Sequence, residues 1–561
     1  MARIKNLRIK NYRCFENFEA SFGDECFVVL IGRGDSGKST ILKAIDALLS
    51  PQWNYPFSDW DFYGGKVEDP IIIEGDIVDV PDEIASLDTI GFNYKLHKSD
   101  GSISSDLSNE EDGDTLALTI RLVVDDSLEP KWYIISGRDD VSDREIHSKE
   151  RELFRSFFVE DSNESHFSFH RQSPLASLTQ NSREERESLN HKMTAIIRGA
   201  FLHGKDISSF EEFDQSALKV KEYASKLGVP SSSFNAQLDF KENAFTLRNV
   251  GLHKDNQPCR LLGNGSRRLI SMAIQLELTQ LGGIVLVDEI EQGLEPDRIL
   301  NIIKMFKGNK CGQMILTTHS PYVVCESTYN QLFHVKSDHT GLWDYHEDFA
   351  AVLRTYPELF FAKKVIACEG KTEEGFLRKM DSIMREKGDG FSLHGVSVAN
   401  CKGGDKFYKV AISLRTYNVD ICVFCDHDAK DIEKKHKEAE EAGCKIVRWE
   451  DGLSLEQQIF KDVCWETLVK LVNLAQELDP KAACYSQIGL SPETISNIAN
   501  DTISNRTKIG LFAKKGSWFK NIDKGEKLSE IVYGDFVNGM ILPESGLYKQ
   551  LDNLTKWIQG A

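Results

Sequence analysis

The sequence lacks the features that mark membrane-spanning, secreted and disordered chains. It contains no run of about 18 apolar residues, which a membrane-spanning helix requires. Its opening, ARIKNLRIKNYRCF, mixes charges where a secretory signal would have a basic segment and then an apolar one, so we expect a cytoplasmic protein. With 41% apolar residues the chain is too hydrophobic for disorder. It is therefore expected to be globular.

The chain is also short of positive charge. Sixty-eight Lys and Arg residues stand against 87 Asp and Glu residues, which gives a formal net charge of −19. This excludes a protein that holds nucleic acid through its overall charge. Any basic site must therefore be local.

A disulfide framework is absent as well. The 12 cysteines are scattered singly through the chain, as is typical of free thiols in a reducing compartment. The one CxxC, Cys422 and Cys425, lies in a β-branched run, where an offset of three places the side chains on opposite faces of a strand. We therefore expect neither a redox pair nor a zinc pair there.

The length of 561 residues exceeds what one hydrophobic core holds, because single cores stop growing at roughly 250 to 300 residues. Alternating strands and helices predict an α/β protein with two parallel sheets. We place the first domain at residues 1–345, with a helical insertion at about 145–230. The second domain, at 346–561, begins a new strand–helix alternation and ends in a helical C-terminal region.

The segment GRGDSGKS fits the phosphate-binding pattern GxxxxGK[ST] between a buried strand and a helix. Its glycines let backbone N–H groups face phosphates, and the helix N-terminus adds a positive dipole. We expect Lys38 to reach the β and γ phosphates and Ser39 to place its hydroxyl on Mg²⁺. The expected nucleotide-binding residues are Gly32, Gly34, Asp35, Ser36, Gly37, Lys38, Ser39 and Thr40.

A second motif supplies acids for the same site. Asp288 and Glu289 follow the apolar run IVLV and so end a strand, where ligands bind in open α/β sheets. Asp288 is expected to hold the Mg²⁺ shell, and Glu289 to orient or deprotonate an attacking water. His319 ends the next predicted strand, where an imidazole can sense the γ-phosphate. A lone histidine is more often structural, so its role depends on the other two residues.

These elements, in this order, resemble the ABC-type ATPases of the SMC and RecF kind over roughly residues 1–345. The resemblance implies ATP as the nucleotide and a head-to-tail dimer of ATPase heads. In that group a signature motif contacts the ATP of the opposite subunit. The segment LLGNGSRRL stands in its place, so Gly263, Gly265 and Ser266 are the expected contacts, although the familiar LSGGQ string is absent. The gap between Gly37 and Gly263 is too short for long coiled coils.

Carboxylates close the strands of the second domain. Glu369 ends a predicted strand and Glu373 lies in the first turn of the helix after it. A carboxylate at the end of a buried strand needs a cation, a partner or a shifted pKa. Asp426 and Asp428 end a later strand on the same side, and their repulsion favours a divalent cation. The alternatives are a helix-capping acid at 373 and a solvated acid pair at 426 and 428.

A glutamate after the first strand, a Gly-Gly turn after the second and DxD after the third resemble a Toprim domain. A Toprim domain after an ABC-type ATPase resembles the OLD (overcoming lysogenization defect) family of ATP-linked endonucleases, including the Gabija anti-phage nuclease and retron-associated members. The resemblance spans essentially the whole chain. It implies that Glu369, Glu373, Asp426 and Asp428 bind two divalent ions, Mg²⁺ or Mn²⁺, which promote phosphodiester cleavage.

Two further residues are expected at this site. Glu456 is preferred over Asp451 as an additional metal ligand. Members of the family also carry a catalytic lysine near the C-terminus, where this chain gathers basic residues between 502 and 527. We prefer Lys520 over Lys524 for that lysine, which stabilises charge on the scissile phosphate.

The sequence therefore predicts a metal-dependent DNA endonuclease controlled by ATP and acting in anti-phage defence. Its expected partners are DNA and further copies of itself, as a dimer or tetramer through the ATPase heads. The resemblance leaves room for a helicase-like partner, or for a retron reverse transcriptase with its DNA–RNA product. The alternative function is a DNA-repair or DNA-binding ATPase whose Toprim domain is not catalytic.

Overall fold

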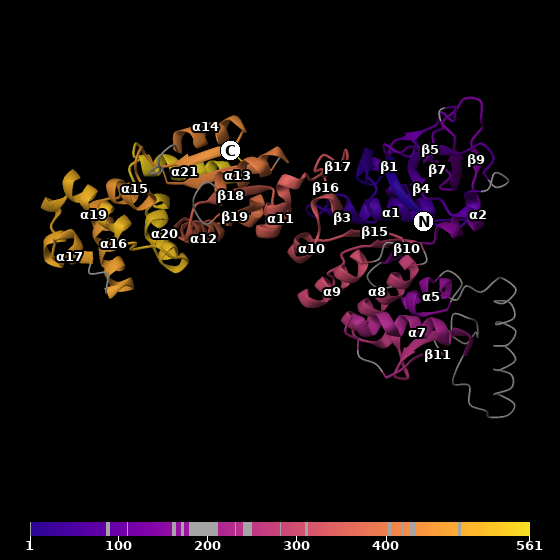
Figure 1. The fold of residues 1–561 in the computed structure, drawn as a ribbon. Coiled ribbons are helices and arrows are strands. Elements are labelled where there is room, and N and C mark those ends of the chain that lie inside the picture. Colours follow the sequence, from indigo (N-terminus) through magenta and orange to yellow (C-terminus); the bar gives the residue numbers. More distant parts are fainter. Residues whose placement is uncertain are drawn as a thin grey trace. The chain divides into compact units, whose positions relative to one another are not determined.

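The computed structural model divides the chain into two compact units, Met1–Pro357 and Glu358–Ala561 (Figure 1). The structure describes residues 2–85, 90–108, 110–159, 164–169, 173–178, 211–229, 232–238, 250–280, 282–308, 312–401, 406–417, 419–426, 432–480 and 484–560. The first unit extends beyond the expected boundary at 345, because helix α11 (Ala350–Thr355) packs against α10 (Pro321–Glu326). Within the described ranges, no helix is both long and apolar enough to cross a membrane.

The first unit begins with an antiparallel sheet of eight strands in the order β2-β1-β4-β7-β5-β6, with β8 beside β7 and β9 beside β8. Leu7 and Ile9 alternate with Arg8, so one face of β1 is buried while Arg8 pairs with Glu74 on the other face (Nε to Oε2, 2.9 Å). The strands are β1 (Arg3–Tyr12), β2 (Phe15–Ser21), β4 (Ile71–Val78), β5 (Lys95–His97), β6 (Ile103–Ser104), β7 (Thr115–Val124), β8 (Pro130–Ile135) and β9 (Arg144–Glu145).

The second sheet of this unit has the order β10-β14-β15-β3-β16-β17. All its pairs are parallel except β16 with β17, so β3, β14 and β15 end at the same edge. Their runs FVVLI, IVLV and QMILT are fully buried, as expected of parallel strands covered on both faces. The strands are β3 (Phe27–Ile31), β10 (Ser156–Val159), β14 (Ile284–Val287), β15 (Gln313–Thr317), β16 (Leu332–Val335) and β17 (Leu342–Asp344).

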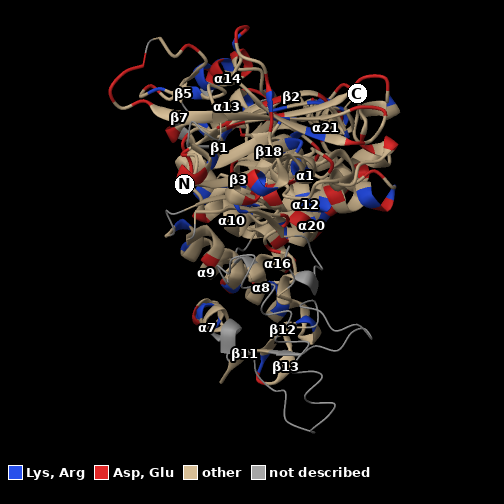
Figure 2. Ribbon diagram, turned by 90° about the vertical axis from the view of Figure 1, so that its right-hand side faces the viewer, with Lys and Arg blue, Asp and Glu red and all other residues tan. Residues whose placement is uncertain are grey.

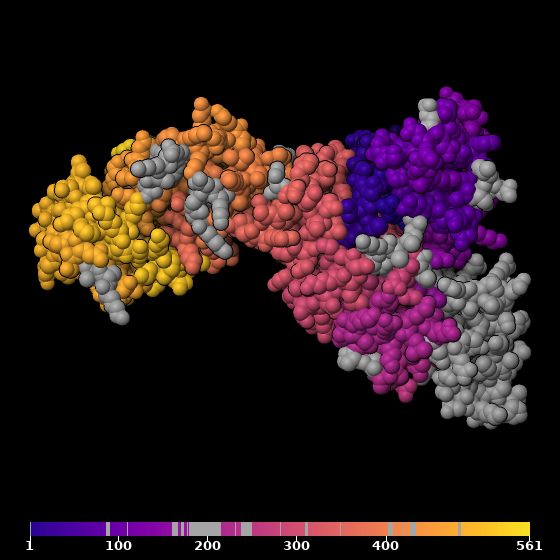
Figure 3. Space-filling model, in the orientation of Figure 1, coloured from indigo at the N-terminus to yellow at the C-terminus, as the bar shows by residue number. Residues whose placement is uncertain are grey.

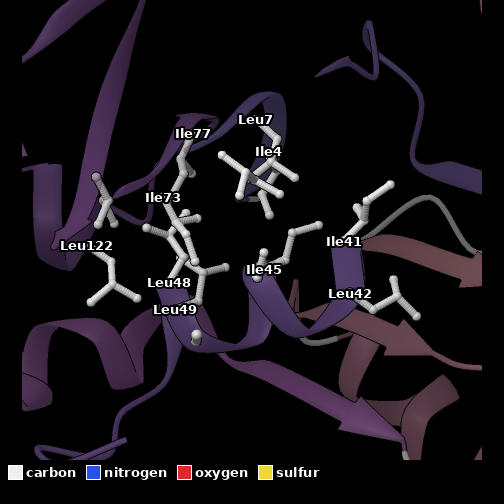
Figure 4. Close-up of a cluster of buried hydrophobic side chains, with 14 of the residues drawn as sticks. Ile4, Leu7, Ile41, Leu42, Ile45, Leu48, Leu49, Ile73, Ile77 and Leu122 are labelled. Atoms are coloured by element: carbon white, nitrogen blue, oxygen red, sulfur yellow. The ribbon is translucent and has the colours of Figure 1, made fainter. Parts of the chain in front are cut away.

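Helix α1 (Lys38–Leu49) lies between these two sheets and contacts strands of both. Its apolar residues recur at helical spacing, and Ile41, Ile45 and Leu48 are fully buried. Figure 4 shows them among side chains of the first sheet, including Ile73 and Leu122. The beginning of α1 is therefore fixed by a packed core, which positions the loop that precedes it.

The stretch from 145 to 230 is not wholly helical, as far as the structure describes it. Its strand β10 pairs in parallel with β14 and so forms an edge of the nucleotide-binding sheet. Its helices are α4 (Ser148–Arg151), α5 (Pro174–Ser177) and α7 (Glu211–Lys226). Helix α7 packs on α8 (Asn264–Gln280) and on β11 of a small antiparallel sheet, β11 (Phe234–Leu238), β12 (Val250–Lys254) and β13 (Gln257–Pro258). The unit also contains α2 (Asp82–Ala85) and α9 (Pro296–Lys307).

The second unit is built on a parallel sheet in the order β19-β18-β20-β21. Its strands are β18 (Lys364–Cys368), β19 (Val396–Asn400), β20 (Asp420–Cys425) and β21 (Lys445–Arg448). Helices α12 (Lys371–Glu386), α13 (Lys406–Thr416) and α14 (Ile432–Glu441) alternate with the strands, which is the predicted βα pattern. Observed parallel strands in both units confirm the predicted α/β class.

A helical region completes the second unit, and its buried side chains join the core under the sheet. It consists of α15 (Leu455–Asp462), α16 (Trp465–Leu478), α17 (Cys484–Ile488), α18 (Pro492–Ile495), α19 (Ile503–Lys515), α20 (Ile522–Val537) and α21 (Gly546–Gln559). The space-filling view shows the outer face of this region in orange to yellow (Figure 3). Figure 2 shows Lys and Arg residues interspersed with Asp and Glu residues along the ribbon.

Candidate functional site

The loop between β3 and α1 borders a pocket of about 430 Å³. Gly37 begins the helix in the left-handed region (φ 95°), and a Cβ there would lie 2.5 Å from Cζ of Phe15. Only glycine fits this combination of backbone angle and close approach. The pocket is lined by Cys14, Gly34, Asp35, Ser36, Gly37, Lys38, Ser39, Thr40, Glu289, Thr317 and His319. The structure thus brings most of the predicted nucleotide-binding residues together.

Lys38 folds back onto its own loop. Its Nζ donates to the carbonyl oxygens of Gly32 (3.0 Å) and Arg33 (2.7 Å). Burial lowers the pKa of Lys38, while the negative charge of Asp288 opposes this shift. Two carbonyl oxygens and a carboxylate thus only partly offset the cost of burying this ammonium group.

Asp288 lies at the carboxyl end of β14 and faces the start of α1. Its Oδ1 accepts hydrogen bonds from the hydroxyl groups of Ser39 (3.0 Å) and Thr317 (2.6 Å). The structure therefore places Ser39 and Asp288, which were expected to share one Mg²⁺ ion, side by side. Their hydroxyl and carboxylate oxygens are the hard ligands that Mg²⁺ prefers.

Glu289 and His319 line the same pocket. Glu289 has a positive φ of 45°, a conformation that is uncommon for residues other than glycine. The segment that carries His319 is held by Glu291, whose carboxylate accepts from the backbone N–H of His319 (2.5 Å) and the hydroxyl of Thr318 (2.7 Å). Partial burial and then the charge of Lys38 lower the pKa of His319. Its imidazole is consequently neutral near pH 7.

The residues expected to act as a signature motif lie at the beginning of α8. Gly263, Gly265 and Ser266 are not among the residues that line the pocket of this chain. Gly265 packs closely on the segment after Glu289, since a Cβ there would lie 3.2 Å from the carbonyl oxygen of Gly293. Contact with the nucleotide of a second subunit stays a prediction.

In the second unit, Glu369 and Asp426 follow neighbouring strands. β18 and β20 are paired with Cys368 opposite Phe424, so the two strands end at the same edge. The backbone N–H of Asp426 donates to the carboxylate of Glu369 and opposes the effect of burial, which raises the pKa of Glu369. The topology thus brings together two acids that lie far apart in the sequence.

The acids Glu373, which is buried, and Asp426, which is half-buried, both have raised pKa values. Burial, followed by the negative charges of Glu456 and Glu369, raises the pKa of Glu373 to about 7. Burial and the charges of Glu373 and Glu456 likewise raise the pKa of Asp426 well above its ordinary value. The Oδ1 of Asp426 also accepts from the backbone N–H of Leu455 (2.8 Å), which begins α15. Several carboxylates that oppose one another's ionisation form a setting in which a cation is favourable.

Of the two further candidate acids, Glu456 belongs to this carboxylate cluster and Asp451 does not. Glu456 is 8% exposed in the first turn of α15, and its Oε2 accepts from the hydroxyl of Ser454 (3.1 Å). Its charge acts on both Glu373 and Asp426, whereas Asp451 is exposed in the turn before the helix. Burial in the tertiary structure, which no local pattern shows, distinguishes the two acids.

Two lysines oppose the effect of burial on Glu369. The positive charges of Lys514 and then Lys520 act to lower the pKa of Glu369. Lys524, the other candidate, pairs with Asp479 instead (3.6 Å). Lys514, on α19, was not singled out from the sequence, where it is the first of two consecutive lysines in a segment with several basic residues.

Part of the predicted site lies outside the described residues, namely Asp428 and the Gly-Gly turn at 403 and 404. Within the ranges that the structure describes, no group of three or more His, Cys, Asp or Glu side chains has a geometry that would hold a metal ion by itself. None of the cysteines within these ranges, Cys422 and Cys425 included, forms a disulfide.

The two units match two classes of domain. The family model described as "AAA domain, putative AbiEii toxin, Type IV TA system" matches residues 27–325, more than half of the chain, and the chain belongs to this family. The model described as "Overcoming lysogenization defect protein-like, TOPRIM domain" matches residues 360–428. The chain thus combines an ATPase domain with an OLD-like Toprim domain, which confirms the predicted domain classes. No curated protein matches it.

Solved structures similar to the chain include heads of SMC proteins. The Smc head bound to the C-winged helix domain of ScpA is 16% identical (TM-score 0.37), with 62% of this chain and 99% of that chain covered. The Smc head with an extended coiled coil bound to the C-terminal domain of ScpA, derived from Pyrococcus furiosus, is 14% identical (TM-score 0.38; 63% and 98% covered). The SMC head from Thermotoga maritima is 14% identical (TM-score 0.31; 61% and 99% covered).

Proposed function

We propose that this protein is a metal-dependent DNA endonuclease whose cutting is controlled by ATP bound or hydrolysed in the first unit. The observation that carries the proposal is the cluster of Glu369, Glu373, Asp426 and Glu456, in which burial and the neighbouring carboxylates raise the pKa of Glu373 and Asp426. Burying like charges together is unfavourable unless a cation or a proton neutralises them. A two-metal Toprim site accounts for this arrangement, and the OLD-like match supports it.

The proposed metal ligands are Glu369, Glu373, Asp426, Asp428 and Glu456. Bound Mg²⁺ or Mn²⁺ ions would activate a water and stabilise the leaving oxygen of an in-line cleavage. The acids of the chain hold and orient these ions from the ends of two strands and from two helices. Lys514 and Lys520, which act on Glu369, supply positive charge for the scissile phosphate of the DNA.

In the first unit, Lys38 and the backbone of its loop bind the phosphates of ATP. Ser39 and Asp288, 3.0 Å apart, provide oxygens for Mg²⁺, and Glu289 orients or deprotonates the water. The neutral imidazole of His319 accepts or donates a hydrogen bond at the γ-phosphate. Gly263, Gly265 and Ser266 complete the site of a second copy, so we propose a homodimer or tetramer of ATPase heads. The OLD-like match supports a role in anti-phage defence.

Cleavage of supercoiled plasmid by the purified protein tests this proposal. The wild type should nick or linearise DNA in Mg²⁺ or Mn²⁺, and lanes with and without ATP should differ. Asp426→Asn and Asp428→Ala should abolish cutting while ATP hydrolysis persists. Asp381→Asn is the matched control, because Asp381 lies about two turns after Glu373 on α12 and pairs with Arg385. Retention of full cutting by Asp426→Asn, or an ATPase without any cutting, would instead favour the DNA-binding ATPase.

A further inference from the structure

The peptide that carries Asp288 and Glu289 is held by a residue from another helix. Arg268 lies in the second turn of α8, and its side chain is buried, with 6% of the residue exposed. Its Nη2 donates to the carbonyl oxygens of Asp288 (2.6 Å) and Glu289 (3.0 Å). Hydrogen bonds from a charged donor are roughly twice as strong as neutral ones. A single guanidinium nitrogen thus fixes two successive carbonyl groups.

The opposite side of the same peptide is fixed by a strand. The backbone N–H of Glu289 donates to Oγ1 of Thr317 (2.8 Å), and that hydroxyl donates to Asp288 (2.6 Å). Glu289 is therefore held at both its N–H and its carbonyl group. Glu289 has a φ of 45°, and any residue other than glycine adopts this backbone angle only at a cost in free energy.

A strained backbone persists only where the surrounding contacts over-determine it. If the hydrogen bonds from Arg268 were lost, Glu289 could relax to negative φ, and its carboxylate would swing away from the pocket. A lysine should not replace Arg268 without loss, because its ammonium lies on a shorter side chain and lacks the fixed donor directions of the guanidinium nitrogen that reaches both carbonyl oxygens.

We propose that Arg268 is a positioning residue for hydrolysis: it holds Glu289 in the left-handed conformation that directs its carboxylate into the nucleotide pocket. Through this contact, the position of α8 sets the position of Glu289. Close packing of Gly265, at the start of α8, on the carbonyl of Gly293 provides a second contact between the same two segments. This inference rests on the proposed role of Glu289 in ATP hydrolysis.

The test compares ATP turnover by the wild type, Arg268→Lys, Arg268→Gln and a control, Glu277→Gln. Glu277 lies on the same helix and pairs with Lys219 (2.9 Å), away from the Asp288–Glu289 peptide, so its substitution perturbs α8 without touching Glu289. We expect both Arg268 variants to lower kcat on the order of tenfold to a hundredfold, since a misplacement of about 1 Å costs up to that much. The KM for ATP and the binding of a fluorescent ATP analogue should change less than about twofold, because the phosphate-binding loop is untouched.

A second measurement separates positioning from general damage. In a Glu289→Gln background, Arg268→Lys should lower the residual turnover much less than it does in the wild type, since the group that it positions is already disabled. An equal factor in both backgrounds, or a loss of ATP affinity that matches the loss of kcat, would overturn the proposal. So would failure of both Arg268 variants to fold while Glu277→Gln folds, because Arg268 would then be a structural residue.

These outcomes do not depend on DNA cleavage. If the wild type hydrolyses ATP but never cuts DNA, the nuclease proposal fails and the role of Arg268 is still measured. If the wild type cuts DNA and Arg268→Lys hydrolyses ATP at the wild-type rate, only the positioning role fails.

Discussion

Gly375 of α12 and Gly525 of α20 face each other where the two helices cross. A Cβ on Gly525 would lie 2.5 Å from the carbonyl oxygen of Thr372 and 3.2 Å from Cα of Gly375. The hydroxyl of Thr372 also donates to the carbonyl of Phe519 (3.2 Å), next to Lys520. This crossing therefore sets how close the lysine segment lies to Glu373, which follows Thr372 on α12.

Gly525→Ala should destabilise the second unit, because the added methyl group meets rigid backbone. Overpacking of this kind costs about 1–3 kcal/mol. Gly534→Ala, in the same helix, meets nothing within 4 Å and should be neutral or stabilising by up to about 1 kcal/mol. Thermal unfolding measures both variants. Similar melting temperatures for the two would contradict the close approach of the helices.

Glu373 should make the stability of the second unit depend on pH. Its pKa is raised to about 7 in the folded protein, so the folded state holds this proton more tightly than the unfolded chain does. The stabilisation is present at acidic pH and is lost as the pH rises through about 7. In EDTA, the melting temperature of the wild type should therefore fall between about pH 5 and pH 8 by more than that of Glu373→Gln.

The control for this measurement is Asp381→Asn, which removes an acid from the same helix outside the carboxylate cluster. Its pH dependence should follow that of the wild type. If Glu373→Gln and the wild type lose stability in parallel over this pH range, the pKa of Glu373 is not raised in the folded protein.

The lysines should differ in their effect on DNA cleavage. Lys514→Met and Lys520→Met remove charges that act on Glu369, and each should slow cutting by about tenfold or more if it stabilises the transition state. Lys524→Met removes a side chain that pairs with Asp479 and should leave the rate unchanged. Cleavage rates are measured at saturating DNA, where a loss of DNA affinity no longer slows cutting and only an effect on the cleavage step remains. If only Lys524→Met cuts slowly, then Lys524 acts in cleavage, and Lys514 and Lys520 do not.

Thr317 should matter for ATP hydrolysis through its hydroxyl group. Thr317→Val removes the donor to Asp288 and the acceptor for Glu289, and hydrogen bonds to charged groups contribute about 1.5–3 kcal/mol. We expect kcat to fall by roughly tenfold to a hundredfold. Thr317→Ser keeps the hydroxyl and should retain most of the activity. Equal losses in both variants would show that the methyl group, and not the hydroxyl, is required.

Much of each site could be predicted because its signals are local in the chain. The phosphate-binding loop is one continuous segment between a buried strand and a helix, and Gly32 and Gly37 of its sequence pattern adopt the positive φ values that favour glycine. Glu369 and Asp426 likewise come directly after apolar strands. Parallel strands that end at one edge then bring such residues together.

Thr317, Arg268 and Lys514 carry no such local signal. Thr317 is one of two threonines in succession, Arg268 is the second of two arginines, and Lys514 is the first of two lysines. In each pair the sequence does not show which residue faces the site, because that depends on the rotation of a strand or helix against its neighbours. The strand β10, within a stretch expected to be helical, was missed for the same reason, since its pairing with β14 is long-range.

The sequence by itself determined the classes of the two domains, because phosphate binding and acid clusters depend on residue types at short, regular spacings. Only the tertiary structure decided how those residues are held: Glu456 is buried beside Asp426, Lys524 turns to Asp479, and Arg268 reaches the backbone of Glu289. Such contacts join segments far apart in the chain. Their geometry follows from how helices and strands pack, and this depends on side chains throughout the core.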